Sequence, residues 1–281
     1  MKIGFTSDCH IEFFERDPSA LKRRHTEINT NLADADLILL GGDMHAGEGP
    51  LLDWIEEMFP DRPVCFITGN HEYYGDIKKE LDNDIHREIK ERGLDTRVFF
   101  LNPGVQIFEP NGEPPIRIIG ATLWSDFKIF GPEYQQIQMQ NAGSKMRDYQ
   151  RIYRNSFKPI TPADTLRWHG QDRAFLIQEL EKPFEGKTVV LTHHAPHPKC
   201  VWDRHMMVEK EKTHGVTGAF VSDMTDIIEH YSIDLWIYGH THFNTDSVVS
   251  GTRITAAQGG YPGEVTSDHP HLKQAGRVID L

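Results

Sequence analysis

Five short apolar runs in this sequence each end in polar residues of the types that bind metal ions. The runs cover residues 2–7, 36–40, 63–68, 188–192 and 235–238, and their length and composition are typical of buried strands. The polar residues that follow them are Asp8, His10, Asp43, Asn70, His71, His193, His194, His240 and His242. If the runs lie side by side in one sheet, these side chains converge at the edge where open α/β sheets bind ligands. The pattern therefore predicts one polar site built at five strand ends.

The side chains at these strand ends offer two carboxylates, one amide and several imidazoles as ligands. This mixture of oxygen and nitrogen suits manganese, iron or zinc, whereas calcium and magnesium prefer oxygen ligands alone. The set is too large for one tetrahedral zinc ion, and two ions that share a bridging carboxylate account for it. Because residues two apart in an extended segment face the same side, Asp8 with His10, and likewise His240 with His242, are expected to face one ion together.

Each fragment alone has a simpler explanation. Asp8 could cap a turn beside a surface His10, and Asn70 could form an Asx turn. The doublet at 193–194 is ordinary in a chain with 16 His. A metal site is the better interpretation, because every fragment follows an apolar run of strand length.

Helical patterns lie between these strands. The sequence predicts helices over residues 19–35, 50–59, 76–92, 161–181 and 222–231. Further strands are expected over residues 98–101, 104–109 and 116–119, with a last strand pair after residue 251. Strands that alternate with helices and are followed by a block of strands indicate an α/β protein with more than one sheet. We expect one domain over residues 1–281.

Residues 124–160 lack a clean period and are rich in aromatic and cationic side chains. Long segments of this kind are often functional lids, and here Arg147 and Arg151 could recognise phosphate while neighbouring aromatic rings stack on the substrate. The alternative is a solvated amphipathic segment that packs on the domain. Further candidates for substrate contacts lie beside the ligand motifs, namely Tyr73, Tyr74, His45 and His197. The tail histidines His269 and His271 are expected at the surface.

The composition sets limits on the function. With 38% hydrophobic and 26% charged residues, the 281-residue chain is typical of a soluble globular protein. Its formal net charge of −12 argues against long nucleic acid as a partner, but not against a phosphate substrate, because bound metal ions invert the local charge.

Cys9, Cys65 and Cys200 are too few for a disulfide framework, which favours a reducing compartment. With no signal peptide and no apolar run of membrane length, we expect a cytoplasmic protein without a membrane partner, and the oligomeric state stays open.

Taken together and in order, the polar blocks resemble the signature of the calcineurin-like metallophosphoesterases. That signature runs D-x-H, G-D, G-N-H-[DE], a histidine after a strand, and G-H-x-H. The matching residues are Asp8-Cys9-His10, Gly42-Asp43, Gly69-Asn70-His71-Glu72, His193 and Gly239-His240-Thr241-His242. They span most of the chain, and the sequence around them is similar to a bacterial subgroup of predicted phosphohydrolases. The resemblance implies an α/β fold, a four-layer αββα sandwich of two mixed β-sheets flanked by helices.

The resemblance also implies a role for each site residue. The expected ligands are Asp8, His10 and His242 for one ion, Asn70, His193 and His240 for the other, and Asp43 as the bridge between them. His193 is preferred to His194 because it is the first residue after the strand. His71 would not be a ligand and would lie over the substrate.

We expect two divalent transition-metal ions (manganese, iron or zinc, with manganese favoured for activity) and a small phosphoester as the substrate. A hydroxide that bridges the ions would attack phosphorus in line with the leaving oxygen. His71 would donate a proton to the leaving oxygen or stabilise the transition state as a cation, and Glu72 or another carboxylate would orient it. A phosphodiester is favoured over a phosphomonoester.

Three other functions remain open at this point. A nuclease or a cyclic-nucleotide phosphodiesterase would use the same metal chemistry. A non-catalytic, protein-binding scaffold of the same fold would be expected to lack His71 or several ligands, and none is missing here. An amidase or lactonase of the metallo-β-lactamase type is disfavoured because its H-x-H-x-D-H motif is absent.

Overall fold

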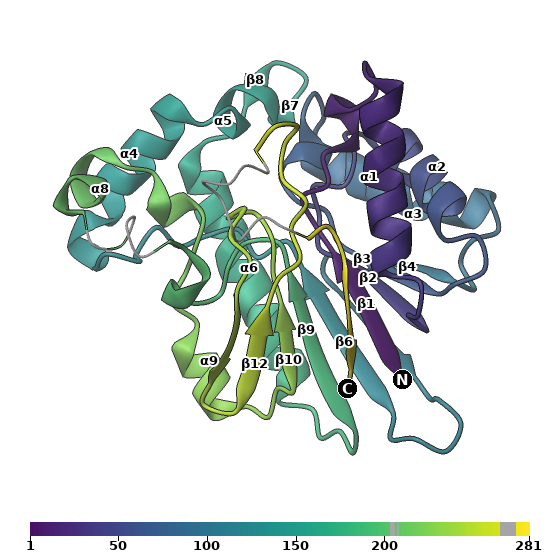
Figure 1. Cartoon of the computed structure of the whole chain (residues 1–281). Coiled ribbons are helices and arrows are strands. Elements are labelled where there is room, and N and C mark those ends of the chain that lie inside the picture. The colour runs from purple at the N-terminus through teal and green to yellow at the C-terminus, as the bar shows by residue number, and fades with distance from the viewer. Residues whose placement is uncertain (203–205, 207, 265–273) are drawn as a thin grey trace.

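The computed structural model describes residues 1–202, 206, 208–264 and 274–281. Two β-sheets pack face to face in its centre, and helices cover the outer face of each sheet (Figure 1). The expected four-layer αββα sandwich is therefore confirmed. His269 and His271 lie outside the described residues.

The first sheet has five strands in the order β13, β1, β2, β3, β4. Their bounds in that order are Arg277–Asp280, Lys2–Thr6, Leu37–Leu40, Val64–Phe66 and Val98–Phe100. β1 to β4 are parallel, and β13 is antiparallel to β1. Parallel strands need crossover connections, which here are helices α1 (Pro18–Asn31), α2 (Glu48–Met58) and α3 (Lys78–Glu91).

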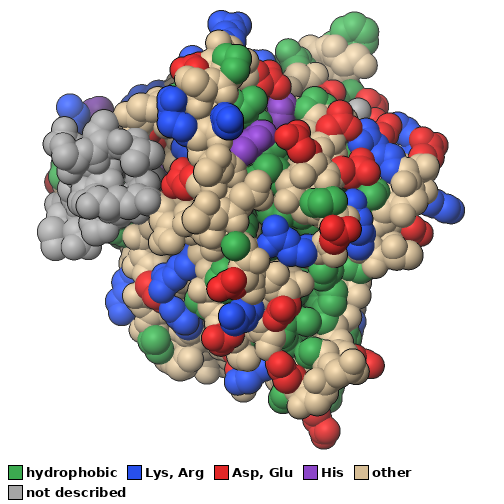
Figure 2. Space-filling view, turned by 45° about the vertical axis from the view of Figure 1, so that its right-hand side comes forward, with side chains coloured by type: hydrophobic (Ala, Val, Ile, Leu, Met, Phe, Trp, Pro, Cys, Tyr) green, Lys and Arg blue, Asp and Glu red, His purple; other side chains and the backbone are tan. Residues whose placement is uncertain are grey.

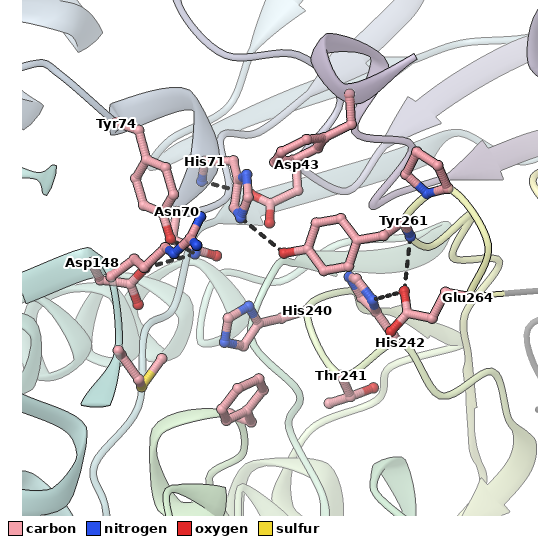
Figure 3. A pocket seen from close by; sticks show the side chains of 15 residues that line it. Asp43, Asn70, His71, Tyr74, Asp148, His240, Thr241, His242, Tyr261 and Glu264 are labelled. Atoms are coloured by element: carbon pink, nitrogen blue, oxygen red, sulfur yellow. Dashed lines mark hydrogen bonds and ion pairs between the residues drawn. The ribbon is translucent and has the colours of Figure 1, made fainter. Parts of the chain in front are cut away.

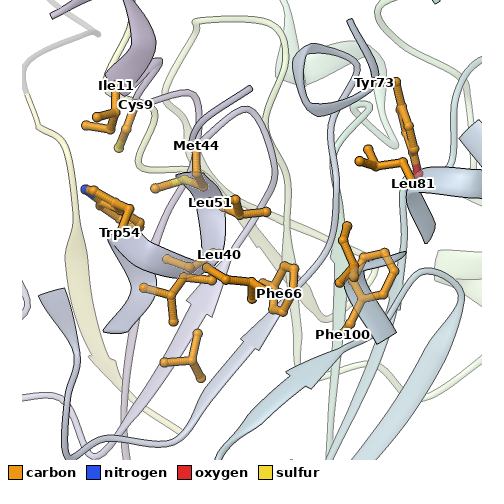
Figure 4. Packing of buried hydrophobic residues seen from close by; sticks show 14 of the residues in the cluster. Cys9, Ile11, Leu40, Met44, Leu51, Trp54, Phe66, Tyr73, Leu81 and Phe100 are labelled. Carbon is orange, nitrogen blue, oxygen red and sulfur yellow. The ribbon is translucent and has the colours of Figure 1, made fainter. Parts of the chain in front are cut away.

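These helices pack on one face of the sheet through apolar side chains about one turn apart. Leu51 of α2 and Leu81 of α3 share one buried cluster with Leu40, Phe66 and Phe100 of the strands, as Figure 4 shows. Full burial of a side chain of this size contributes about 1.5–3 kcal/mol. The apolar residues that recur about once per helical turn in the sequence therefore identify the face of each helix that packs on the first sheet.

The second sheet has six strands in the order β11, β12, β10, β9, β6, β5. Their bounds in that order are Asp246–Val249, Thr252–Thr255, Leu235–Ile237, Lys187–Thr192, Ile116–Ala121 and Gly104–Phe108. The four central strands are parallel, and the two edge strands are antiparallel to their neighbours. Helices α6 (Pro162–Leu180) and α9 (Thr225–His230) cover its outer face.

Burial on both faces explains why the central strands are apolar throughout. In β2, Leu37 and Leu39 pack between the two sheets, whereas Ile38 and Leu40 pack under the helices. Strands that are covered on both sides read as continuous hydrophobic runs in the sequence. The two sheets thus form one sandwich, in which β1, β10 and β12 point the same way (Figure 1).

A further layer, here called the cap layer, lies beyond the carboxyl ends of the strands (Figure 1). Its first segment contains η3 (Pro132–Tyr134), α4 (Gln135–Lys145), α5 (Asp148–Arg151), β7 (Tyr153–Asn155) and β8 (Lys158–Pro159). The chain between β9 and β10 adds η4 (Pro198–Cys200), α8 (Glu209–His214) and η5 (Thr217–Ala219). Gln138 joins the two segments, because its amide donates to the carbonyls of Glu211 and Lys212 at 2.7 and 2.9 Å.

The predicted helices are all present, with ends that differ by a few residues. Thr161 begins α6 through a capping box with Asp164. Two short helices, η1 (Ile11–Phe13) and η2 (His71–Tyr73), follow β1 and β3. None of the described helices combines the length and the hydropathy that a membrane crossing requires.

Two strands lie after residue 251 as expected, β12 and β13, but they do not pair with each other. β12 pairs with β11 and β10 in the second sheet, while β13 crosses to the first sheet and pairs with β1. Pairing of the chain's last strand with its first depends on contacts between distant segments, which a local pattern does not encode.

Candidate metal centre

The polar residues at the five strand ends lie together, where the carboxyl ends of the two sheets meet. β1, β2 and β3 belong to the first sheet, whereas β9 and β10 belong to the second. The five strands therefore do not lie side by side in one sheet. The side chains still converge, because the packed sheets present their carboxyl ends side by side.

Asp8, His10 and His242 form the first group of potential metal ligands. Nε2 of His10 lies 3.1 Å from Nε2 of His242, which lies 3.5 Å from a carboxylate oxygen of Asp8. Nδ1 of His242 bonds to Oε2 of Glu264 at 2.8 Å, which places a proton on Nδ1 and directs Nε2 toward the group. Oδ2 of Asp8 is buried and has no hydrogen-bond partner among the described residues.

Asp43, His193 and His240 form the second group, with the side chain of Asn70 beside them. Nε2 of His193 lies 3.5 Å from Asp43 and 3.1 Å from the amide oxygen of Asn70. Nδ1 of His193 donates to the carbonyl of Gly41 at 2.8 Å. Its Nε2 is therefore the ring nitrogen directed at the group, where it can bind a cation once its proton is displaced.

Asp43 stands between the two groups. Its Oδ2 atom lies 3.9 Å from Nε2 of His10 and 3.5 Å from Nε2 of His193. This shared carboxylate, the unpartnered oxygen of Asp8 and the mixture of oxygen and nitrogen donors fit two divalent transition-metal ions. The residues present therefore suit the kind of metal centre that the sequence predicts.

Two of the candidate ligands, the buried His193 and the partly buried His242, lie beside carboxylates. Burial lowers the pKa of His193, but the charge of Asp43 and a hydrogen bond to it raise that pKa to about 9. Burial likewise lowers the pKa of His242, and Asp8 and Glu264 raise it to about 10. A potential that holds a proton on a buried imidazole also attracts a divalent cation, which must displace that proton to bind.

Five of the candidate ligands have a left-handed backbone conformation, which residues other than glycine seldom adopt. Their φ angles are 51° for Asp8, 46° for His10, 53° for Asp43, 67° for His240 and 49° for His242. Strain of this kind costs on the order of 1–3 kcal/mol per residue and clusters at functional sites. The chain is therefore not extended at these residues, contrary to the expectation that residues two apart project to the same side. Asp8 and His10 still share a group, whereas His240 and His242 belong to different ones.

Glu72 holds two of these turns together. Its buried carboxylate accepts the backbone N–H groups of Asp43, Met44 and Gly69 at 3.0, 2.7 and 2.7 Å. Burial and the charge of Asp43 raise the pKa of Glu72 to about 7. Glu72 therefore fixes the loop after β2 to the loop after β3, and it is not the carboxylate that orients His71.

His71 begins η2 and is oriented by Glu12 of η1. Nδ1 of His71 lies 3.1 Å from Oε1 of Glu12, and Nε2 lies 3.1 Å from the hydroxyl of Tyr261. Burial lowers the pKa of His71, but Asp43 and Glu12 raise it above its ordinary value. His10, Asp43 and His71 are also close enough to hold an ion. The geometry therefore admits His71 both as an acid and as a ligand, and a substitution distinguishes the two roles.

A cavity of about 750 Å³ opens onto both groups (Figure 3). Its aromatic walls come from Phe13, Tyr74, Phe220 and Tyr261. The cap layer contributes Met146, Arg147 and Asp148. The other lining residues are Asp43, Asn70, His71, His240, Thr241, His242, Pro262 and Glu264. The cavity thus joins the candidate metal groups, His71 and the cap layer in one space.

Tyr73 does not line the cavity, contrary to the prediction. Its side chain is fully buried, and its hydroxyl bonds to Thr68 at 2.6 Å and to Asp82 at 2.7 Å. Its neighbour Tyr74 lines the cavity instead. Successive side chains of a 3₁₀ turn point about 120° apart, so adjacent tyrosines face the core and the site respectively.

Besides Tyr74, Arg147 of the predicted substrate contacts lines the cavity, whereas Arg151, His45 and His197 are not among the described lining residues. Arg151 lies over the ring of Tyr74, 5.3 Å from its centre and outside the lining. His45 bonds to a glutamate at 3.1 Å, and His197 accepts a backbone N–H of η4 at 3.1 Å. Proximity to a ligand motif in the sequence does not decide which way a loop side chain turns, so these side chains differ from the prediction.

His194 turns away from the metal groups. Its Nδ1 lies 3.3 Å from the carbonyl of Thr122, and its ring lies 5.1 Å from Trp124 and 4.2 Å from His240 between centres. Burial lowers the pKa of His194. His193 is therefore the member of the doublet within reach of the second group.

Several residues of the site are not predicted from the sequence, namely Glu12, Phe13, Asp148, Phe220, Tyr261 and Glu264. Glu12 lies only two residues beyond His10, and its position beside this first motif is the only feature of the sequence that could have identified it. Tyr261 and Glu264 come from the loop after β12, far from every motif. They reach the site only because the sheets place that loop beside the end of β10.

Asp148 connects the cap layer to the second group. Its Oδ1 atom accepts the amide N–H of Asn70 at 2.9 Å and the hydroxyl of Tyr74 at 2.6 Å. Because the amide nitrogen of Asn70 is held there, its oxygen faces Nε2 of His193. Hydrogen bonds of this kind fix the orientation of a metal ligand.

Replacing Asp148 with alanine is expected to weaken binding of the second ion about 10- to 100-fold, because Asn70 loses the bond that fixes its amide. Calorimetric titration of the apoprotein with metal measures the change. The matched control is Gln150→Ala, an exposed change in the same short helix, which is expected to keep the wild-type affinities. Equal affinities in Asp148→Ala and the wild type would show that Asn70 does not depend on the cap layer.

Residues 1–244 match the sequence model of a family described as calcineurin-like phosphoesterase, a range that contains all five polar blocks. The chain is also 23% identical over 280 residues to an uncharacterised protein of Acanthamoeba polyphaga mimivirus, with 96% of this chain and 94% of the relative covered. Among solved structures it is similar to a phosphopantetheinyl hydrolase from Mycobacterium tuberculosis, with a TM-score of 0.69 and 15% identity over 99% of this chain and 95% of that one. The likeness to the solved structure concerns the fold alone.

Proposed function

The chain belongs to the calcineurin-like phosphoesterase family, and on that premise we propose that it is a dinuclear metal-dependent phosphoesterase that hydrolyses a small phosphodiester. The observation that carries the proposal is the pair of ligand groups that share Asp43 and lie beside His71 in one cavity. The proposed ligands are Asp8, His10 and His242 for the first ion, Asn70, His193 and His240 for the second, and Asp43 for both.

Two divalent ions, when bound, would lower the pKa of a water molecule and neutralise charge on the phosphoryl oxygens. The donor set mixes carboxylate and imidazole, which supports manganese, iron or zinc, and manganese is proposed for activity. His71, held by Glu12, presents its Nε2 atom to the cavity and would donate a proton to the leaving oxygen. Asp43 accepts the backbone N–H of His71 at 2.8 Å, so the acid and the shared ligand are held in one unit.

The charges of the cavity favour a phosphodiester, which carries one negative charge, over a phosphomonoester, which carries two. Among the described lining residues, Arg147 is the only cationic side chain apart from the histidines, and Asp148 and Glu264 add negative charge. Phe13 and Phe220 offer aromatic surface against which a ring in the leaving group could pack. Arg147 is proposed to contact the substrate on the side of the cap layer.

The cap layer is proposed to cover the substrate side of the site within a single domain, because it supplies residues 146–148 to the cavity. A small phosphoester, rather than long nucleic acid, is the proposed substrate. On the face shown in Figure 2, the Lys and Arg side chains of the described residues are interspersed with Asp and Glu. A long nucleic acid would instead need many cationic contacts along one path.

The test combines the metal content of the purified protein with hydrolysis of bis-p-nitrophenyl phosphate and p-nitrophenyl phosphate in added manganese. We expect two transition-metal ions per chain and faster hydrolysis of the diester. Faster hydrolysis of the monoester would identify a phosphatase, and selective cleavage of an oligonucleotide or a cyclic nucleotide would identify one of the alternatives. A protein with neither metal nor hydrolysis would be a scaffold.

A further inference from the structure

Tyr261 places its hydroxyl group at the wall of the cavity, beside the proposed acid. The hydroxyl lies 3.1 Å from Nε2 of His71. Its ring stacks on His10, with centres 4.2 Å apart and planes inclined by 22°. Figure 3 shows the phenol directed toward His71, with Asp43 above it and His242 below it in that view. The hydroxyl is thus close both to the proposed acid and to the first group of ligands.

The backbone that carries Tyr261 is held on both sides. Its N–H donates to Oε2 of Glu264 at 2.8 Å, and the same oxygen bonds to Nδ1 of His242. On the other side, the buried guanidinium of Arg24 donates to the carbonyl of Gly260 at 3.1 Å. Gly260 has a φ of 71°, which glycine adopts without strain. The position of the phenol is therefore built by groups that also orient a candidate metal ligand.

The hydroxyl of Tyr261 has hydrogen-bonding capacity to spare. A phenol donates one hydrogen bond and also accepts, and His71 is the only partner found for it among the described residues. The stacking on His10 and the edge contact with Phe13, at 5.4 Å between ring centres, require only the ring. The hydroxyl is therefore free to bond a group bound in the cavity.

We propose that Tyr261 is a catalytic residue whose hydroxyl donates a hydrogen bond to an anionic phosphoryl oxygen of the substrate, beside His71. This inference rests on the proposed phosphoesterase function. A hydroxyl bonded to an ionised oxygen makes a shorter bond, about twice as strong as one between neutral groups. The contact strengthens as negative charge develops on the phosphoryl oxygens, so it acts mainly on the transition state.

The test is Tyr261→Phe, which keeps the ring on His10 and removes only the hydroxyl. We expect kcat/KM for bis-p-nitrophenyl phosphate to fall about 10- to 100-fold, the range of a hydrogen bond to a charged group. Binding of inorganic phosphate to the manganese-loaded protein, measured by calorimetry, is expected to weaken by about tenfold, again because one such bond is lost. The metal content is expected to match the wild type. Tyr231→Phe, at the end of α9 and outside the cavity lining, is the matched control.

The outcomes separate this inference from the proposed function. Unchanged turnover and unchanged phosphate binding in an active Tyr261→Phe protein would overturn the inference and leave the function standing. Loss of metal from Tyr261→Phe would also overturn it, because the phenol would then support a ligand rather than contact the substrate. If the wild type hydrolyses neither ester, the proposed function fails, and phosphate binding alone decides: weaker binding in the variant supports the contact, and equal binding refutes it.

Discussion

Asp43→Asn is expected to lose most of its bound metal and to hydrolyse phosphoesters about a thousandfold more slowly than the wild type, a loss of about 4 kcal/mol of transition-state stabilisation. Asp43 is buried, and its Oδ2 atom lies 3.9 Å from Nε2 of His10 and 3.5 Å from Nε2 of His193. An asparagine has the same shape, but it is neutral and cannot offer an anionic oxygen to two ions at once. Both proposed metal positions should therefore weaken together.

Elemental analysis of the purified variant, together with its rate on bis-p-nitrophenyl phosphate, measures the effect. Asp61→Asn, an exposed change of the same chemistry between α2 and β3, is the control and should keep both ions and full activity. Thermal unfolding of both variants in chelator shows whether the fold itself is intact. An Asp43→Asn protein with two ions and normal turnover would refute the shared-carboxylate arrangement.

Much of the fold follows from local patterns in the sequence. The run at 36–40 is apolar at every position because β2 is covered on both faces, and this recurs at each central strand. The helix periods over 76–92 and 161–181 identify the faces that pack on the sheets. The assignment of strands to sheets does not follow, because β13 joins β1 across nearly the whole chain. Such pairings are decided by packing between distant segments.

The site, like the fold, can be predicted only in part from local patterns in the sequence. The polar residues at the strand ends can be collected from the sequence, because parallel strands bring their carboxyl ends together. The left-handed turns that aim Asp8 and His240 have no local signal, since neither residue is a glycine. Glu12, Asp148 and Tyr261 come from three separate segments, and each makes a hydrogen bond to a motif residue. A single polar side chain in a loop carries no period, so a pattern search does not find it.

These three contacts support different residues of the site. Asp148 supports the second group through Asn70, whereas Glu12 and Tyr261 hold the two ring nitrogens of His71. His71 therefore has both nitrogens engaged by groups that are not in the proposed ligand sets. That arrangement favours a role in proton transfer, and it makes His71 the residue whose replacement best separates catalysis from metal binding.

His71→Ala is expected to keep both ions and to slow hydrolysis of an ester with a basic leaving group by about 10²- to 10⁴-fold, the usual contribution of a general acid. The loss should be much smaller with a p-nitrophenolate leaving group, because that weakly basic oxygen departs without a proton. Methyl phenyl phosphate and methyl p-nitrophenyl phosphate provide the pair of substrates. The control is His86→Ala, an exposed change on α3.

Metal content decides between the two roles that the geometry admits for His71. Its side chain lies close enough to His10 and Asp43 for the three to hold an ion together. If His71 is a ligand, His71→Ala should lose metal and slow both substrates equally, since the shared loss would come before any proton transfer. If His71 is the acid, metal content should stay at the wild-type level and the two leaving groups should diverge. Equal slowing with full metal content would contradict proton donation and would leave stabilisation of charge in the transition state as the role of this histidine.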